Sequence, residues 1–292
     1  MERCTFAPAG TPLCCAVSGG PDSVALLALA VAAGCEVTAV HVDHGLRAGS
    51  EAEADLVARA AATVGARFSG VRVHVAAGPN LEARARAARL SVLPPGSATG
   101  HTMDDQAETV LVNLLRGAGL DGLAGMRPGP AHPLLAIRRA DTHALCETLG
   151  FEPVQDPSNA DPRFVRNRVR HELLPLASSL AGRDLVPVLA RQAAVLADEA
   201  GLLDALAAEI DAGDASELAT APPPLARRAA RRWLRAGSPH PPDLAAVERV
   251  LAVARGQLGA TDVAPGIRVR RSRGALSSAP IAPGASGSVG AR

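Results

Sequence analysis

Short apolar runs alternate with longer segments of helical periodicity through the first half of the chain. The runs predict strands at 13–17, 36–42 and 71–75, and the periodic segments predict helices at 23–33 and 51–64. Two further helices are expected, one opened by Asn80 and one by Asp104. Strands that alternate with helices form a parallel sheet with helices on its faces, so this half predicts an α/β fold.

The second half of the chain differs from the first in composition and periodicity. Segments rich in alanine and leucine, with helical periodicity, are separated by proline clusters at 222–224 and 238–242. We therefore predict a first domain at 1–177 and a smaller, mainly helical domain with its linker at 178–278. The small-residue, proline-containing end at 279–292 is expected to be disordered.

Charge separates the two parts of the second half. Overall the 292 residues carry a net charge of +1, with 48% hydrophobic and 20% charged residues, as in a globular protein. Residues 182–220 contain eight acidic residues and two arginines, whereas residues 222–273 contain eleven arginines and three acidic residues. Clustered arginine neutralises phosphates, so the second segment, with Arg231 and Arg232, predicts a nucleic-acid contact, against the alternative of a solvated surface. With four Phe, one Trp and no Tyr, stacking on bases is nearly excluded.

The cysteines and the N-terminus bear on the cellular compartment. Five cysteines are unevenly spaced without a C-x-x-C pair, which is typical of reduced thiols and speaks against a disulfide or zinc framework. We find neither the pattern of a signal peptide nor an apolar run of membrane-spanning length. We expect a cytoplasmic protein with no membrane partner, and the sequence leaves open whether it forms a homodimer.

The turn after the first predicted strand has the composition of an anion cradle. Its glycines can close the backbone around a ligand, and the start of the next helix favours a phosphate. Neither the lysine-containing loop of P-loop enzymes nor a G-x-G-x-x-G fingerprint is present. Backbone amides and serine hydroxyls must then hold the anion, with Asp22 placed for a magnesium ion; a generic glycine-rich turn is the alternative. The turn consists of Ser18, Gly19, Gly20, Pro21, Asp22 and Ser23.

Other polar clusters fall at the expected edge of the sheet. His41 and Asp43 end the second predicted strand, where alternate side chains point to opposite faces, so zinc binding is disfavoured. His101, Asp105 and Glu108 share one face at the start of a helix and can meet one ligand, whereas Asp104 is expected to cap that helix.

Arginines at two places could meet phosphate. Arg86 and Arg89 lie three apart on one predicted helix and can face phosphate or cover the sheet edge. Arg166, Asn167 and Arg170 belong to a dense basic run that forms either a solvent-facing strip or a polyanion site. Upstream, the D-P-S-N turn at 156–159 could bind the ammonium group of lysine or simply cap itself.

The run S-G-G-P-D-S after a first strand resembles the PP-loop of ATP pyrophosphatases, which split ATP into AMP and pyrophosphate and use the AMP to activate a substrate oxygen. Four further stretches are similar to the tRNA(Ile)-lysidine synthetase family. The resemblance is strong over 13–175 and weaker over 222–276. The stretches are HVDHGLR at 41–47, NLEARARAAR at 80–89, GHTMDDQAETVLVNLLRGAGLDGLAGM at 100–126 and DPSNADPRFVRNRVRHELLP at 156–175.

The resemblance implies an adenine nucleotide alpha hydrolase-like catalytic domain followed by a small tRNA-binding domain. It implies ATP and Mg²⁺ as cofactors, free L-lysine and the CAU-anticodon tRNA(Ile) as partners, and lysidine, AMP and pyrophosphate as products. The implied catalytic residues are Asp22, His101, Asp105 and Arg86, with magnesium on Asp22 and Asp105. ATP is implied to contact residues 18–23, His41 and Asp43, and tRNA or phosphate to contact Arg166, Asn167, Arg170, Arg231 and Arg232.

The chain also departs from the family pattern. Only nine residues separate Arg89 from Thr99, so the fourth strand is expected to be very short, and His132 stands where the family usually has arginine. Two rival interpretations follow: another PP-loop enzyme, such as a tRNA thiolase or an amide-forming synthetase, or a catalytically impaired tRNA-binding homologue. The paired Cys14 and Cys15 lie in a predicted strand, which disfavours sulfur transfer.

Overall fold

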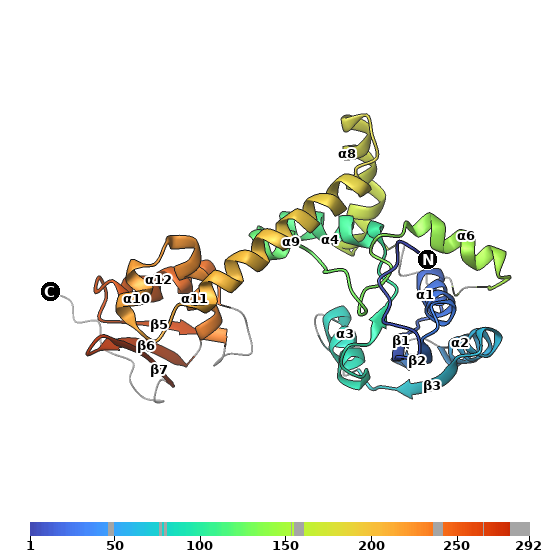
Figure 1. The fold of residues 1–292 in the computed structure, drawn as a ribbon, viewed down its shortest axis with the longest axis horizontal. Coiled ribbons are helices and arrows are strands. Elements are labelled where there is room, and N and C mark those ends of the chain that lie inside the picture. The colour runs from blue at the N-terminus through green and yellow to red at the C-terminus, as the bar shows by residue number, and fades with distance from the viewer. Residues whose placement is uncertain are drawn as a thin grey trace. The chain divides into compact units, whose positions relative to one another are not determined.

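The computed structural model describes the chain in two compact units, residues 1–197 and 198–292 (Figure 1). The described residues are 1–45, 50–75, 78, 81–152, 154, 161–235, 242–264 and 266–280. The D-P-S-N turn at 156–159, Arg47 and residues 281–292 of the predicted tail lie outside them.

The first unit contains a four-stranded parallel sheet in the order β3-β2-β1-β4. Its strands are β1 (Pro12–Ala16), β2 (Glu36–Asp43), β3 (Arg67–Arg72) and β4 (Ala98–Thr99). The predicted α/β class is confirmed, and β4 is as short as expected. The third strand was predicted too late, at 71–75. It is an edge strand that is exposed over most of its length, so Phe68 is the single large apolar residue before Val71 and the first half gave little apolar signal.

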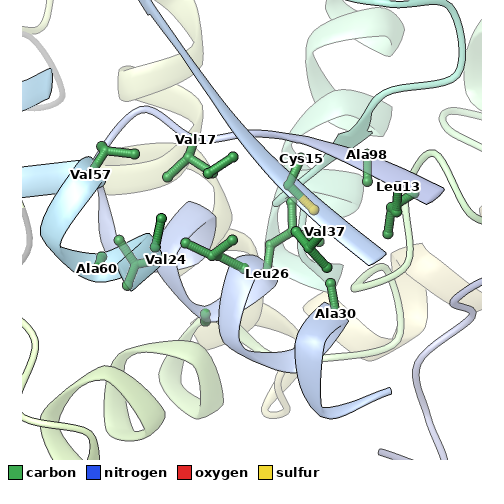
Figure 2. Packing of buried hydrophobic residues seen from close by; sticks show 14 of the residues in the cluster. Leu13, Cys15, Val17, Val24, Leu26, Ala30, Val37, Val57, Ala60 and Ala98 are labelled. Carbon is green, nitrogen blue, oxygen red and sulfur yellow. The ribbon is translucent and has the colours of Figure 1, made fainter. Parts of the chain in front are cut away.

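Helices cover the sheet and continue the chain beyond it. Apolar side chains of β1 and β2 pack against α1 and α2 in the core shown in Figure 2, which includes Cys15, Val24, Leu26, Val37 and Val57. The helical elements are α1 (Pro21–Ala32), α2 (Ser50–Val64), α3 (Leu81–Val92), α4 (Met103–Leu115), α5 (Leu120–Leu123), α6 (Arg139–Thr148), α7 (Val165–Arg168), the π-helical turn η2 (Val169–Leu173), α8 (Leu174–Ala181) and α9 (Val186–Ala208).

Three cysteines are buried and two are half-buried, all as free thiols. Burial raises the pKa of Cys15 to about 12, so this thiol packs as a small apolar group. Within the described residues, no single helix is long and apolar enough to cross a membrane. One bent pair, Val165–Ala181 with Val186–Ala208, passes the same test by length and composition only.

The second unit combines helices with a small sheet. Beyond the end of α9 it contains α10 (Ala215–Thr220), α11 (Pro223–Arg235) and α12 (Leu244–Ala254). An antiparallel sheet follows, in the order β5-β6-β7, with β5 (Ala260–Ala264), β6 (Ile267–Ser272) and β7 (Ala275–Pro280). The sheet was not predicted, because arginines outnumber the two alternating apolar residues of β6. Strand β7 also includes the first two residues of the expected tail.

Candidate active site

A cavity of about 450 Å³ lies at the carboxyl edge of the parallel sheet, where such sheets bind ligands. Its lining comes from the ends of β1 and β2, the turn at 18–23, Arg89 of α3 and the segment from Thr99 to Asp105. The short segment before Thr99 therefore does bring His101 and Asp105 to the same cavity as the glycine-rich turn.

The turn at 18–23 is organised by its own polar groups. Gly19 has a φ of 88°, and a Cβ there would lie 2.8 Å from Val154, so only glycine fits. The Ser23 hydroxyl donates to the Gly20 carbonyl at 2.8 Å and accepts from the Ser18 amide at 3.2 Å. Ser23 thus shapes the turn, whereas the exposed Ser18 and the first turn of α1 are left to meet an anion.

Gly100 sets the distance between the two halves of the cavity. A Cβ at this position would lie 2.6 Å from the carbonyl oxygen of Asp22 and 3.0 Å from the amide nitrogen of Ser23. Because both contacts are with backbone atoms, no side-chain movement can relieve them. The absence of a side chain at Gly100 lets the segment that carries His101 pack directly on the start of α1.

If the cavity holds ATP, as the resemblance of the turn implies, Gly100→Ala should weaken ATP binding by about tenfold to a hundredfold, because crowding the packed backbone distorts the cavity and such crowding typically costs about 1–3 kcal/mol. Isothermal titration calorimetry measures this effect. Gly119→Ala is the matched control, because a Cβ there meets nothing within 4 Å. Equal affinities for the two variants would show that this close approach does not shape the cavity.

Two histidines share the hydroxyl of Thr99. Thr99 Oγ1 lies 2.7 Å from Nδ1 of His101 and 2.8 Å from Nδ1 of His132, and it donates to the Ala131 carbonyl at 3.2 Å. A hydroxyl has one proton and two lone pairs, so when it donates to Ala131 it can accept from both Nδ1–H groups. This arrangement makes Nε2 of His101 a proton acceptor.

Burial lowers the pKa of His101 to about 4, with Asp105 opposing that shift and His132 and two arginines adding to it. His101 is therefore neutral near pH 7. A neutral imidazole that lines a cavity can accept a hydrogen bond, and then a proton, from a bound group.

Asp105 is fully engaged by donors. Its Oδ2 accepts from the amide and the hydroxyl of Thr102 at 2.9 and 2.8 Å, and its Oδ1 accepts from Arg139 and Arg166, both at 2.9 Å. Burial alone would raise the pKa of Asp105, but the arginines and the Thr102 amide outweigh it and hold the pKa at about 2.

The expected cap of α4 was assigned to the wrong residue. Thr102 is the N-cap, and Asp105 completes the capping box. Asp104 instead accepts two hydrogen bonds from the Arg138 side chain at 3.1 Å and one from the Arg139 amide at 2.8 Å.

Glu108 lies at the centre of an arginine cluster. The side chain is fully buried and accepts from Arg139 at 2.9 Å, Arg166 at 2.9 Å and Arg170 at 2.6 and 3.1 Å. Of these arginines, Arg170 also lines the cavity. The polyanion candidates Arg166 and Arg170 are therefore held by carboxylates of α4, and Asn167 donates to the carbonyl of Asp161 at 2.9 Å.

Asp22 is less well compensated than Asp105. Its carboxylate accepts a hydrogen bond from Thr142 and lies 3.5 Å from Nε of Arg139. Burial is the largest influence and raises the pKa of Asp22, with Thr142 and Arg139 opposing it. The carboxylate lines the cavity and gains from a further cation beside it.

The residues at the end of β2 divide into two roles. His41 is buried and lines the cavity; its Nδ1 donates to the carbonyl of Val17 at 2.9 Å, and its Nε2 has no hydrogen-bond partner among the residues that the structure describes. Asp43 accepts from the Gly45 amide at 2.8 Å and lies 3.7 Å from Arg72, which holds the chain after the strand. Of the two, His41 is placed to meet a ligand in the cavity.

The two arginines of α3 are placed differently. Arg89 lines the cavity, and burial, aided by Arg86, lowers its pKa. Arg86 is exposed and is not part of the lining. In the second unit, the side chain of Arg232 donates to the carbonyls of Ala207 and Ile210, and Arg231 is half-buried on α11.

Sequence reasoning missed Arg139 and Thr142, which start α6 and contact Asp22. Their partners lie more than 30 residues away, and local patterns do not show such pairs. The one local signal was the Arg138-Arg139 pair directly after the apolar stretch 134–137.

Comparisons with known proteins cover nearly the whole chain. Residues 6–177 match the family model of the PP-loop domain, and residues 214–277 match that of the TilS substrate binding domain. A tRNA(Ile)-lysidine synthase of Nocardia farcinica is 44% identical over 284 residues, 89% of each chain. That of Mycolicibacterium paratuberculosis is 46% identical over 239 residues, which cover 77% of this chain and 74% of the relative.

Among solved structures, the U34-tRNA thiolase NcsA from Methanococcus maripaludis aligns with a TM-score of 0.49 at 16% identity. The alignment covers 65% of this chain and 72% of that chain.

Proposed function

Because the chain belongs to the tRNA(Ile)-lysidine synthase family, we propose that it joins lysine to the wobble cytidine of the tRNA(Ile) that has a CAU anticodon. One observation supports this most directly. The S-G-G-P-D-S turn and the segment carrying His101 line a single cavity of a size that suits a nucleotide. We also propose that the enzyme acts in the cytoplasm, with its tRNA substrate.

The proposed reaction has two steps. The carbonyl oxygen of cytosine bonds to the α-phosphorus of ATP, and pyrophosphate leaves. The ε-amine of lysine then bonds to the ring carbon that carries this oxygen. The bond between that carbon and the oxygen breaks, AMP leaves with the oxygen, and the amine loses a proton. Activation is needed because the carbonyl oxygen by itself is a poor leaving group. The wobble base must be splayed out for the attack, as an anticodon loop permits.

Residues of the cavity fit ATP. The amides at the start of α1, with the Ser18 hydroxyl, suit the phosphates. The unpartnered, buried Nε2 of His41 is an acceptor that suits the exocyclic amine of adenine. Arg89 and Arg170 add positive charge to the same lining. Together these groups would orient the nucleotide with its phosphates toward Asp22 and His101.

Asp22 fits a magnesium ion better than Asp105 does. Mg²⁺ in nucleotide sites is usually bound by one or two carboxylates and the substrate phosphates. Asp105 already accepts four hydrogen bonds, whereas the raised pKa of Asp22 indicates a carboxylate short of positive charge. When bound, the ion would stabilise negative charge on the departing pyrophosphate. We therefore assign the metal to Asp22 and a positioning role to Asp105.

His101 supplies the proton acceptor for the second step. His101 is neutral near pH 7, and when its Nδ1 donates to Thr99 its Nε2 carries no proton. Nε2 can then take the proton that the lysine amine loses. Asp105 completes the capping box of α4, the helix that follows His101, and accepts hydrogen bonds from Arg139 and Arg166.

The proposal is tested by incubating the purified protein with ATP, Mg²⁺, radiolabelled lysine and the CAU-anticodon tRNA(Ile). We expect label in the tRNA, dependent on ATP, and none in the same tRNA with a different wobble base. Folded protein that releases pyrophosphate with this tRNA but incorporates no lysine would indicate a different PP-loop enzyme. Failure of both reactions would indicate the catalytically impaired alternative.

A further inference from the structure

The sheet of the second unit has two unlike faces. In an antiparallel sheet, residues directly opposite one another lie on the same face. Val269 and Leu276 lie on the inner face and belong to the buried core beneath α10, α11 and α12 (Figure 1). The residues that alternate with them form the outer face.

The outer face is made almost entirely of small residues and arginine. All eight of its residues are exposed in the part of the chain that the structure describes. None carries a large apolar side chain, and five are alanine or serine. We call this surface the platform; its residues are Ala260, Asp262, Arg268, Arg270, Ser272, Ala275, Ser277 and Ala279.

Positive charge on the platform is available for a ligand. Arg268 is paired with Asp262 at 2.7 and 3.1 Å. Arg270 lies between Ala260 and Ser277 on the neighbouring strands, and its side chain forms no hydrogen bond or ion pair with any described residue. Its guanidinium is thus flanked by side chains too short to cover it.

Three of the five arginines of α11 are engaged within the unit by the following contacts. Arg227 is paired with Glu248 at 2.5 Å, Arg228 is paired with Asp204, and Arg232 donates to carbonyls at the end of α9. They stabilise the packing of helices, which explains much of the arginine excess seen in the sequence. Clustered arginine alone therefore does not locate the nucleic-acid surface.

The turn beside the platform carries another arginine in an unusual conformation. Arg273 and Gly274 form the two-residue turn between β6 and β7, with φ values of 50° and 84°. A turn with two positive φ values favours Asn, Asp or Gly at its first position. Arginine adopts this backbone conformation less readily than those residues do. Residues held in such unfavourable conformations cluster at functional sites.

We propose that the platform, with Arg273 at its edge, binds the sugar–phosphate backbone of a base-paired stem of the tRNA. This inference rests on the proposed function, which supplies the RNA. Small side chains let a broad surface approach closely, and Ser272 and Ser277 can hydrogen-bond to phosphate or ribose hydroxyls. The platform holds no aromatic ring on which an unpaired base could stack, so the anticodon loop is a poorer fit.

Arg270→Gln tests the platform by fluorescence anisotropy of labelled tRNA in the absence of ATP and lysine. Loss of one phosphate contact should weaken binding about fivefold at 0.15 M salt and reduce the slope of log affinity against log salt by roughly 0.9. Arg227→Gln is the matched control, because it removes the same charge from the same unit at a paired arginine. Equal weakening by both variants, or none by Arg270→Gln, would overturn the proposal.

Arg273→Asn gives a second, independent readout. We expect its melting temperature to rise, because asparagine adopts the turn conformation more easily, while tRNA affinity falls about fivefold. A purely structural arginine would not show these opposite changes, and unchanged affinity would remove Arg273 from the surface. Inverting base pairs of the tRNA stems should leave affinity unchanged if the backbone is recognised, whereas a large loss would contradict backbone recognition. These measurements do not depend on lysine transfer, so failure of the proposed reaction is distinguishable.

Discussion

Asp22→Asn is expected to reduce pyrophosphate release by about a thousandfold while tRNA binding stays near that of the parent protein. The substitution keeps the shape of the side chain and an oxygen that accepts from Thr142, but it removes the negative charge that we propose binds the metal. Removing a group that stabilises developing charge typically costs about a hundredfold to a thousandfold. Because burial raises the pKa of Asp22, its charge opposes folding near pH 7, so the variant should melt no lower than the parent. Coupled pyrophosphate release, tRNA anisotropy and thermal melting give the three readouts.

Asp104→Asn is the matched control for this prediction. Burial would raise the pKa of Asp104, but hydrogen bonds from Arg138 and from the Arg139 amide outweigh it and lower the pKa, so the charge stabilises the fold. Its variant should therefore melt lower while pyrophosphate release stays near normal, the reverse of the pattern at Asp22. If Asp22→Asn retained pyrophosphate release, Asp22 would have no metal role, and Asp105 would have to be reconsidered despite its four donors.

The residues that touch the ligand cavity were largely predictable, because they belong to contiguous motifs. A strand followed by S-G-G-P-D-S places a turn at the sheet edge whatever the distant packing, and His101 follows the shortest strand at the same edge. The principle that parallel sheets bind ligands at their carboxyl ends then brings the two together. Gly100 is one exception. It is adjacent to His101, yet its contact with the backbone of Asp22 is visible only in three dimensions.

The electrostatic partners were not predictable from local patterns. Arg139 lies 34 residues from Asp105 and 31 from Glu108 along the chain, and Arg166 lies 61 and 58 away. A basic run such as 163–170 looks the same in sequence whether it faces RNA or a buried carboxylate. The arginines of α11 show the same ambiguity, because their clustering suggested an RNA contact, yet Glu248 and Asp204 form ion pairs with two of them.

The platform shows the opposite case. Strand β6 combines three arginines with only two apolar residues, and β7 consists mostly of small residues, so hydrophobic patterning gave no strand signal. The arginine cluster was still visible, and the register of β6 with β5 and β7 separates Arg270, which is available, from Arg268, which is paired. Pairing across strands, rather than density along the chain, distinguishes a binding arginine from a structural one.

Glu108→Ala is expected to destabilise the first unit by about 3–5 kcal/mol, because it removes the fully buried partner of three guanidinium groups and leaves Asp105 as the partner that all three share. In calorimetry, the transition of the first unit should shift down while that of the second, which has its own core, stays in place. Glu172→Ala, which breaks the exposed pair with Arg168, is the control and should change little. A variant that melted like the parent would mean that Asp105 alone can hold the arginines. Loss of stability would instead show that the fully buried Glu108 joins η2 to α4 and thereby places Arg170 in the cavity.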